Sequence, residues 1–385
     1  MGKRELLLIV AFAIAGAVVY QATAPAPAPG ERSFSPTQII EHIRRGIRGN
    51  RASAESVNTT VYPVDRAITD LQVTWSGGTA AELTIVGEER EDISSELKVH
   101  SNAFDDAEAQ RTAKATVLKL DRAGMRLVAS IDFPKEGRQT AYLTLHVPAR
   151  LLLKTASARG RTRITNVAGA EVDSGRGDTE ITQVKGRVAG SYRNGNLRVS
   201  GAGSIKLTTV GADLRLEQIA GETSIEMRAG NLRGADLGGP IDIDTTAVDI
   251  ELEKLEKTNG MVRISATAGS LSLKGLRTEA RIDARNSDVD AMIERAAPLA
   301  IYSEGGSRVE ITPPPGGYRL DAVASDGDIS VPEGTVQVTA NGQEHRATGA
   351  VKGGGPTITI RTAHGSIRVR GREETEKRLT TEKRS

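Results

Sequence analysis

Cysteine is absent from the 385-residue chain, and aromatic residues make up only 3% of it. Without cysteine there is no thiolate metal site, no cysteine nucleophile, no disulfide bond and no lipid-modified N-terminal cysteine. A globular core usually depends on large aromatic side chains for its bulk. The chain instead carries 41 glycines, which suits a thin array of small aliphatic side chains joined by many turns.

A large charge of one sign is also missing. The 51 Lys and Arg residues nearly cancel the 49 Asp and Glu residues, which leaves a formal net charge of +2. This balance gives no general attraction to nucleic acid, so no nucleic-acid partner is predicted. The histidines are not spaced as metal ligands are, and the sequence predicts neither a metal site nor a cofactor.

The stretch from Gly160 to about Val331 repeats one short unit. Each unit begins at a small or turn-forming residue, the turn marker, and usually places apolar residues two and four positions later, with polar neighbours between them. This alternation is typical of a strand with one buried face. The first ten markers lie 17 to 21 residues apart and the last follows after 38: Gly160, Gly177, Gly195, Ala212, Gly230, Val248, Gly269, Ser287, Ser307, Gly327 and Gly365.

A second strand follows in each unit, and coils of two strands at near-constant spacing are typical of a solenoid. We therefore predict an all-β fold, with a β-solenoid of about ten coils of 17–21 residues over residues 151–371. Residues 55–150 are predicted to form a β-rich N-terminal cap with one helix at 105–114, because an open solenoid end leaves backbone groups unpaired.

The C-terminal region departs from the regular spacing. Residues 332–362 are predicted to be an insertion with a hairpin, because Thr335–Ala340 alternates and Asn341-Gly342 is a favoured turn pair. This hairpin is expected to close the end of the array. Residues 372–385 carry charges of both signs and are predicted to be disordered.

The N-terminus is predicted to be an export signal, residues 1–23. Lys3 and Arg4 precede the apolar run Leu6–Tyr20, which fits either a cleaved signal peptide or a retained signal anchor. A Pro/Ala linker and a short helix follow over residues 24–54. In both alternatives the rest of the chain lies outside the cytoplasm, in the cell envelope or secreted.

Several motifs resemble those of a known family. These are Asp106-Ala107-Glu108-Ala109, Val147-Pro148-Ala149, the repeated turn-Gly-Asp/Asn-apolar-x-apolar units, and an ending that runs from Gly353-Gly354-Gly355-Pro356 to Ile367-Arg368-Val369. Over residues 55–371 the chain resembles the bacterial putative-adhesin family of β-strand repeat proteins. The resemblance implies a cell-envelope β-solenoid without an assigned activity. The coils that begin at Val248 and Ser307 lack the turn glycine, so a bulge or kink is expected there.

The residue directly after each turn marker is polar, and in a stack these residues form a polar turn column. Its candidate members are Asp178, Asn196, Asp213, Asn231, Asp249, Asp288 and Asp328. A carboxylate row could bind Ca²⁺ or a repetitive polymer. The favoured interpretation is structural, since Asp, Asn and Ser hydrogen-bond their own turn backbone, and the Gly-Gly-x-Gly-x-Asp motif of Ca²⁺-binding β-rolls is missing.

Carboxylates also gather in two short stretches, Asp242, Asp244 and Asp249, and Asp283, Asp288 and Asp290. Glycan-cleaving enzymes use such groups as acid and base. Here they alternate with apolar residues, which favours an outward charge ladder paired with Arg263, Arg281 and Arg285.

We therefore predict a non-catalytic extracytoplasmic protein whose surface serves binding, adhesion or scaffolding. Its partner is expected to be an envelope polymer or protein, with membrane contact through the N-terminal segment. Two alternatives remain open: a β-helix enzyme that acts on an envelope or extracellular polysaccharide, and an envelope-stress regulatory protein.

Overall fold

The computed structural model describes residue 16 and residues 52–76, 79–157, 160–174, 176–332 and 336–372. Apart from residue 16, residues 52–54 and residue 372, the predicted export signal, linker and charged tail lie outside this part of the chain. Among the described residues, no helix is long and apolar enough to cross a membrane.

The predicted all-β character is confirmed in the described residues, which are almost entirely strands. Among the described residues between 52 and 371 the helices are α3 (Asp106–Ala115) and a short 3₁₀ turn, η1 (Leu255–Lys257). The chain divides into two compact units. The first comprises Met1–Ser56, Val99–Thr116 and Phe133–Gln139, and the second comprises Val57–Lys98, Val117–Asp132 and Thr140–Ser385.

Helix α3 belongs to the first unit, at the position where the sequence predicts a helix. Asp105 caps it, since its side chain accepts a hydrogen bond from the Glu108 backbone N–H at 2.8 Å. The buried Thr112 hydroxyl lies 2.7 Å from the Ser101 hydroxyl, and the Ser56 hydroxyl donates to the Ala113 carbonyl at 2.8 Å. The helix is therefore held by hydrogen bonds as well as by its small alanines. β1 (Ala52–Pro63) and β4 (Asp92–Ala103) contribute residues to both units.

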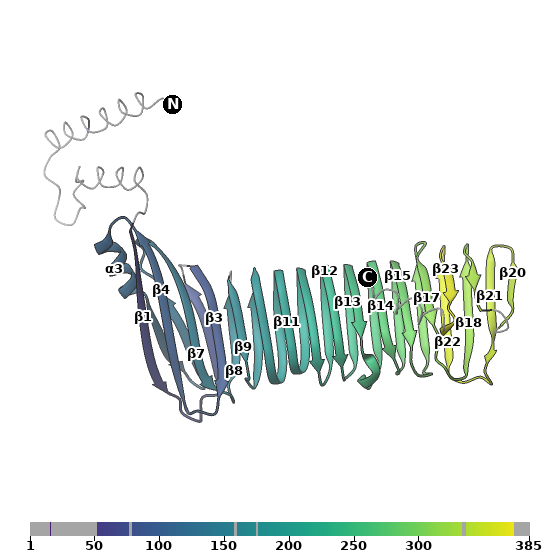
Figure 1. Ribbon diagram of the computed structural model, residues 1–385, viewed down its shortest axis with the longest axis horizontal. Helices are drawn as coiled ribbons and strands as arrows, with labels where there is room; N and C mark the ends of the chain where they lie inside the picture. The colour runs from purple at the N-terminus through teal and green to yellow at the C-terminus, as the bar shows by residue number, and fades with distance from the viewer. Residues whose placement is uncertain are drawn as a thin grey trace. The chain divides into compact units, whose positions relative to one another are not determined.

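The second unit is a parallel stack of coils in which each coil supplies two strand segments (Figure 1). We call the segments that pair in register with residues 205–210 the first strand row, and those that pair with residues 213–217 the second strand row. Its first coils are β8 (Leu152–Ser157) with β9 (Arg161–Thr165), and β10 (Gly169–Ser174). Five long strands then run through the corner and serve both rows: β11 (Gly177–Ile219), β12 (Thr223–Leu237), β13 (Ile241–Glu253), β14 (Val262–Leu276) and β15 (Ala280–Ile293).

An aliphatic spine runs through the stack where the sequence predicts it. Leu214 pairs in register with Leu232, Leu232 with Ile250, Ile250 with Leu271, and Leu271 with Val289. These side chains are at most 2% exposed. Because each coil offers only a few such side chains, the buried core exists only between stacked coils.

The corners between the two rows explain the turn markers. At the corner before Asn231, Ala229 has φ 57° and Gly230 has φ 122°. A Cβ added to Gly230 would overlap the carbonyl oxygen of Ala212 in the preceding coil. Other corners instead turn a buried side chain inward at the marker, as at Ala212, Val248, Ser287 and Ser307.

The two coils expected to bulge or kink are both irregular. Val248 itself pairs with Gly230 in an unbroken register along β12 and β13, because an inward valine replaces the glycine, but the coil that it begins bends into η1 after β13. The offset between paired residues accordingly rises from 18 (Gly230 with Val248) to 21 (Ile250 with Leu271). At Ser307 the offset between paired residues changes from 19 (Arg285 with Glu304) to 20 (Val289 with Val309). Gly305 and Gly306 supply the additional corner residue, both with positive φ.

Both ends of the stack are interleaved, so the order of coils in space differs from their order along the chain. At one end β2 (Asp70–Ser76) lies between β6 (Arg126–Asp132) and β8. In the second strand row, β3 (Thr79–Glu88) lies between β7 (Arg138–Pro148) and β9. β6 also pairs with β5 (Val117–Ala123), which runs antiparallel to it.

The other end repeats this arrangement. The last coil of the sequence, β22 (Thr357–Ala363) and β23 (Ser366–Val369), is inserted into the stack. β22 lies between β16 (Leu299–Glu304) and β18 (Tyr318–Ser325), and β23 lies between β17 (Arg308–Thr312) and β19 (Ile329–Ser330). The hairpin of β20 (Val338–Asn341) and β21 (Glu344–Val351) then pairs antiparallel with β18.

Candidate binding face

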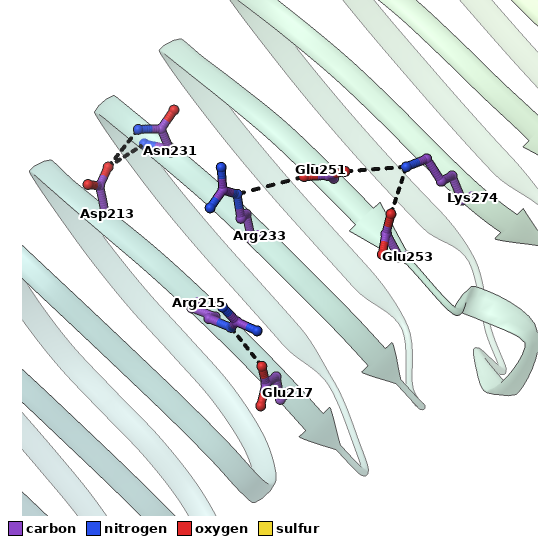
Figure 2. Close-up of polar contacts among 8 residues, drawn as sticks. All are labelled: Asp213, Arg215, Glu217, Asn231, Arg233, Glu251, Glu253 and Lys274. Carbon is purple, nitrogen blue, oxygen red and sulfur yellow. Dashed lines mark hydrogen bonds and ion pairs between the residues drawn. The ribbon is translucent and has the colours of Figure 1, made fainter. Parts of the chain in front are cut away.

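The outward positions of the second strand row form a polar face over β11 to β14 (Figure 2). Strand alternation turns the aliphatic side chains inward, so the residues between them point to solvent. The face carries Asp213, Arg215 and Glu217 from one coil, Asn231 and Arg233 from the next, then Glu251, Glu253 and Lys274.

Two adjacent clefts lie on this face. The larger, of about 380 Å³, is lined by Asn196, Leu197, Arg198, Asp213, Leu214, Arg215, Asn231 and Arg233. The smaller, of about 230 Å³, is lined by Arg215, Leu216, Glu217, Arg233, Gly234, Ala235, Glu251 and Glu253. Because Arg215 and Arg233 border both clefts, the two hollows form one polar surface across consecutive coils.

The polar turn column borders this surface, and its side chains are joined in pairs. Asp178 Oδ1 accepts from Asn196 Nδ2 at 2.9 Å. Asp213 Oδ1 accepts from Asn231 Nδ2 at 2.7 Å and from the Asn231 backbone N–H at 3.2 Å. The carboxylate of one coil thus binds the next coil, whereas the residue types predict hydrogen bonds to its own turn.

The same pairing continues along the stack. Asp249 Oδ1 accepts from the Ser270 backbone N–H at 2.9 Å and hydroxyl at 2.6 Å, and Asp288 Oδ1 accepts from the Arg308 backbone N–H at 2.8 Å. Coils whose turn-column carboxylate accepts these hydrogen bonds therefore alternate with coils that donate them, so the hydrogen-bonding pattern repeats every two coils. Asp328, near the end of the stack, lies 3.4 Å from His345 Nδ1. In the described part of the chain, no group of three or more His, Asp or Glu side chains is placed to hold a metal ion.

The two carboxylate stretches are split between the strand rows. Asp242 and Asp244 pair in register with Ser224 and Glu226 in the first row, whereas Asp249 lies opposite Asn231 in the second row. Asp283 likewise lies in the first row, opposite Ser265, while Asp288 and Asp290 lie in the second. Neither stretch gathers on one face.

The charge partners predicted for these carboxylates are found only in part. Arg281 Nε donates to Asp283 Oδ2 at 2.9 Å, and its guanidinium lies 5.0 Å from the centre of the Tyr302 ring. Arg285 Nε instead donates to Glu304 Oε2, at 3.3 Å. Arg263 lies in register beside Asp242 and Arg281.

Sequence reasoning missed the most regular feature of the face, an arginine row formed by Arg198, Arg215 and Arg233. Arg215 Nε donates to Glu217 Oε1 at 2.7 Å, and Arg198 reaches Glu217 Oε2 at 3.2 Å. Arg233 Nε lies 3.7 Å from Glu251 Oε2. The detectable signal is the recurrence of arginine two residues after three consecutive members of the polar turn column, Asn196, Asp213 and Asn231.

The carboxylates beside the row are held ionised. The hydrogen bond from Arg215 lowers the pKa of Glu217, and the hydrogen bond from Lys274 lowers the pKa of Glu253. Lys274 Nζ lies 2.6 Å from Glu253 Oε1 and 3.3 Å from Glu251 Oε1. At neutral pH the face therefore presents fixed charges of both signs, arranged in columns along the stack.

Comparison with known proteins identifies the family. The family model of Toastrack DUF4097 matches residues 77–370. The chain belongs to the Toastrack family. The family resemblance inferred from the sequence is thereby confirmed.

The solved structures similar to this Toastrack chain are remote in sequence. A putative adhesin from Parabacteroides distasonis has 10% identity and a TM-score of 0.32, over 82% of this chain and 97% of that chain. A putative adhesin from Parabacteroides merdae has 9% identity and a TM-score of 0.31, over 83% and 98%. A putative lipid binding protein from Parabacteroides distasonis has 11% identity and a TM-score of 0.25, over 83% and 99%. No curated protein matches the chain.

Proposed function

We propose that this Toastrack protein is a non-catalytic extracytoplasmic binding protein, and that the polar face of the second strand row is its binding surface. The observation that carries the proposal is the larger cleft, which is lined by side chains from three consecutive coils. A surface built from equivalent positions of stacked coils suits a partner that repeats along its own length. Adhesion and scaffolding are the roles that such a surface serves.

The proposed address is the cell envelope. It rests on the basic and apolar N-terminal segment, residues 1–23, which acts as a retained anchor or a cleaved signal peptide. In this proposal residues 24–54 form a Pro/Ala linker and a short helix, 55–150 the cap, 151–371 a solenoid of about ten coils with the hairpin insertion 332–362, and 372–385 a disordered charged tail. Cell fractionation with sequencing of the mature N-terminus tests the address, and recovery of the intact chain from the cytoplasm would contradict it.

Binding and catalysis are separated by exposing the purified full-length chain to polysaccharides and peptidoglycan. The expected result is retention of at least one polymer without release of fragments. Asp242→Ala and Asp288→Ala should leave both readouts unchanged, because Asp242 lies in the first strand row and Asp288 lies on β15, beyond the polar face over β11 to β14. Reproducible bond cleavage that either substitution abolishes would establish the rival function, a polysaccharide-cleaving enzyme.

A further inference from the structure

The arginine row places three guanidinium groups at the same position of consecutive coils. Arg215 and Arg233 are register partners, and neighbouring strands lie about 4.8 Å apart. The side chains of Arg198, Arg215 and Arg233 are 50%, 56% and 68% exposed. The row is thus a line of solvent-accessible cations with a regular spacing.

The lining of the larger cleft carries a net positive charge, whereas the adjoining smaller cleft, with two arginines and three glutamates, carries a net negative charge. The eight residues that line the larger cleft include three arginines and one aspartate, so three positive charges minus one negative charge give +2. That aspartate, Asp213, already accepts two hydrogen bonds from Asn231. The cleft therefore complements an anion, and the neighbouring amides of Asn196 and Asn231 can meet neutral hydroxyl groups.

Each carboxylate that pairs with the arginine row is shared between two cationic side chains. Glu217 serves both Arg198 and Arg215, while Glu251 is shared between Arg233 and Lys274. Ion pairs at such exposed sites contribute little to stability, because water screens them. A guanidinium offers five N–H donors in a plane, which matches a carboxylate in a two-point contact. A ligand carboxylate can therefore join or replace the internal partners without a large cost.

We propose that the arginine row binds a linear acidic polysaccharide, with carboxylates of successive uronate units placed on successive coils. This inference rests on the proposed function and names its ligand class. A polymer is favoured over a single small anion because the row offers equivalent sites in a line, and each occupied site holds the next carboxylate near its own arginine.

The test measures binding of polygalacturonate to the immobilised full-length chain, with neutral dextran and inorganic polyphosphate as comparison polymers. The triple variant Arg198→Ala, Arg215→Ala, Arg233→Ala is expected to bind polygalacturonate about tenfold more weakly or worse. The matched control is Arg228→Ala, Arg281→Ala, Arg285→Ala, which removes the same charge from the first strand row. It should leave the affinity within about twofold of the unmodified chain.

Glu217→Gln provides a gain-of-binding test that misfolding cannot imitate. Removal of this carboxylate frees Arg198 and Arg215, so the affinity for polygalacturonate should rise about threefold. Equal losses in the two triple variants, or polyphosphate binding at the row without polygalacturonate binding, would overturn the inference while leaving a binding function in place. If no polymer binds, both the inference and the proposed function fail.

Discussion

At the scale of single residues, the corner glycines set how closely two coils approach. Gly230 combines a positive φ of 122° with a position directly against the Ala212 carbonyl oxygen. The two constraints are separable, because Gly124 also has a positive φ, of 65°, but no atom lies within 4 Å of an added Cβ there.

Gly230→Ala is expected to lower the free energy of unfolding by about 3–5 kcal/mol, because the methyl group adds a steric overlap to the backbone strain. Gly124→Ala should cost only about 1–2 kcal/mol, the price of the left-handed conformation alone. Urea denaturation followed by circular dichroism measures both. Equal losses of unfolding free energy for the two variants would contradict the close contact between Gly230 and the preceding coil.

The polar turn column was predictable from the sequence, but its bonding was not. A polar residue after every turn marker reports an exposed corner, and Asp and Asn satisfy turn backbones in many proteins. The spacing cannot reveal that Asp213 reaches forward to Asn231, since own-turn and next-coil bonds use the same residue types. The arginine row was overlooked for a related reason, because Arg215 and Glu217 are close in sequence and their charges cancel in any local sum.

At the scale of elements, a buried ion pair fastens the inserted last coil to its neighbour. Glu310 of β17 contacts Arg370, which follows β23, and their side chains are only 6% and 10% exposed. The Arg370 backbone N–H donates to the Ile311 carbonyl at 2.9 Å, and Arg370 also lies 3.7 Å from Asp290. The end of β23 is therefore tied to two earlier coils by charge and by backbone.

Glu310→Gln is expected to destabilise the fold by about 3 kcal/mol or more, because it leaves the buried guanidinium of Arg370 without its main counter-charge. The double variant Glu310→Leu, Arg370→Met should recover most of the loss, since apolar side chains of similar size need no charge partner. Glu304→Gln, which breaks the exposed pair with Arg285, is the control and should change stability little. Thermal denaturation compares the four proteins, and equal Tm values for Glu310→Gln and Glu304→Gln would contradict the assignment.

Sequence patterns located most elements because two periodicities were strong: the two-residue alternation within each strand and the near-constant spacing of the turn markers. Alternation found the strands. The predicted turn pair Asn341-Gly342 is one residue early, since Asn341 ends β20 opposite Glu344 and the turn is Gly342-Gln343. The pattern identified the coil that begins at Val248 as irregular but not where it bends, which is at η1. The corner itself stays regular, because it accepts a buried side chain in place of glycine once the φ of the preceding residue is positive.

At the scale of the second unit, interleaving gives each inserted coil two bonded edges. β22 has hydrogen-bonded neighbours in β16 and β18, and β2 has them in β6 and β8. The unpaired edges belong instead to other strands. Repeats in the sequence predict that coils stack. They do not predict the stacking order, because every coil presents equivalent aliphatic side chains to its neighbours, and so the interleaving was not foreseen.

Amide hydrogen exchange should therefore be as slow in β2 and β22 as in β13, because every interior strand is bonded on both sides. β20 pairs with β21 and supplies the fast-exchanging comparison. Mass spectrometry of peptic fragments measures the rates. Exchange in β22 as fast as in β20 would show that the last coil opens independently of its neighbours.

The position of the last coil also constrains how the protein matures. Residues 357–363 are synthesised after β16 and β18, yet their place is between those two strands. Until they have been made, the facing edges of the two strands have no occupant. This part of the stack therefore reaches its finished fold only when a later segment of the chain arrives to fill the slot between two earlier ones.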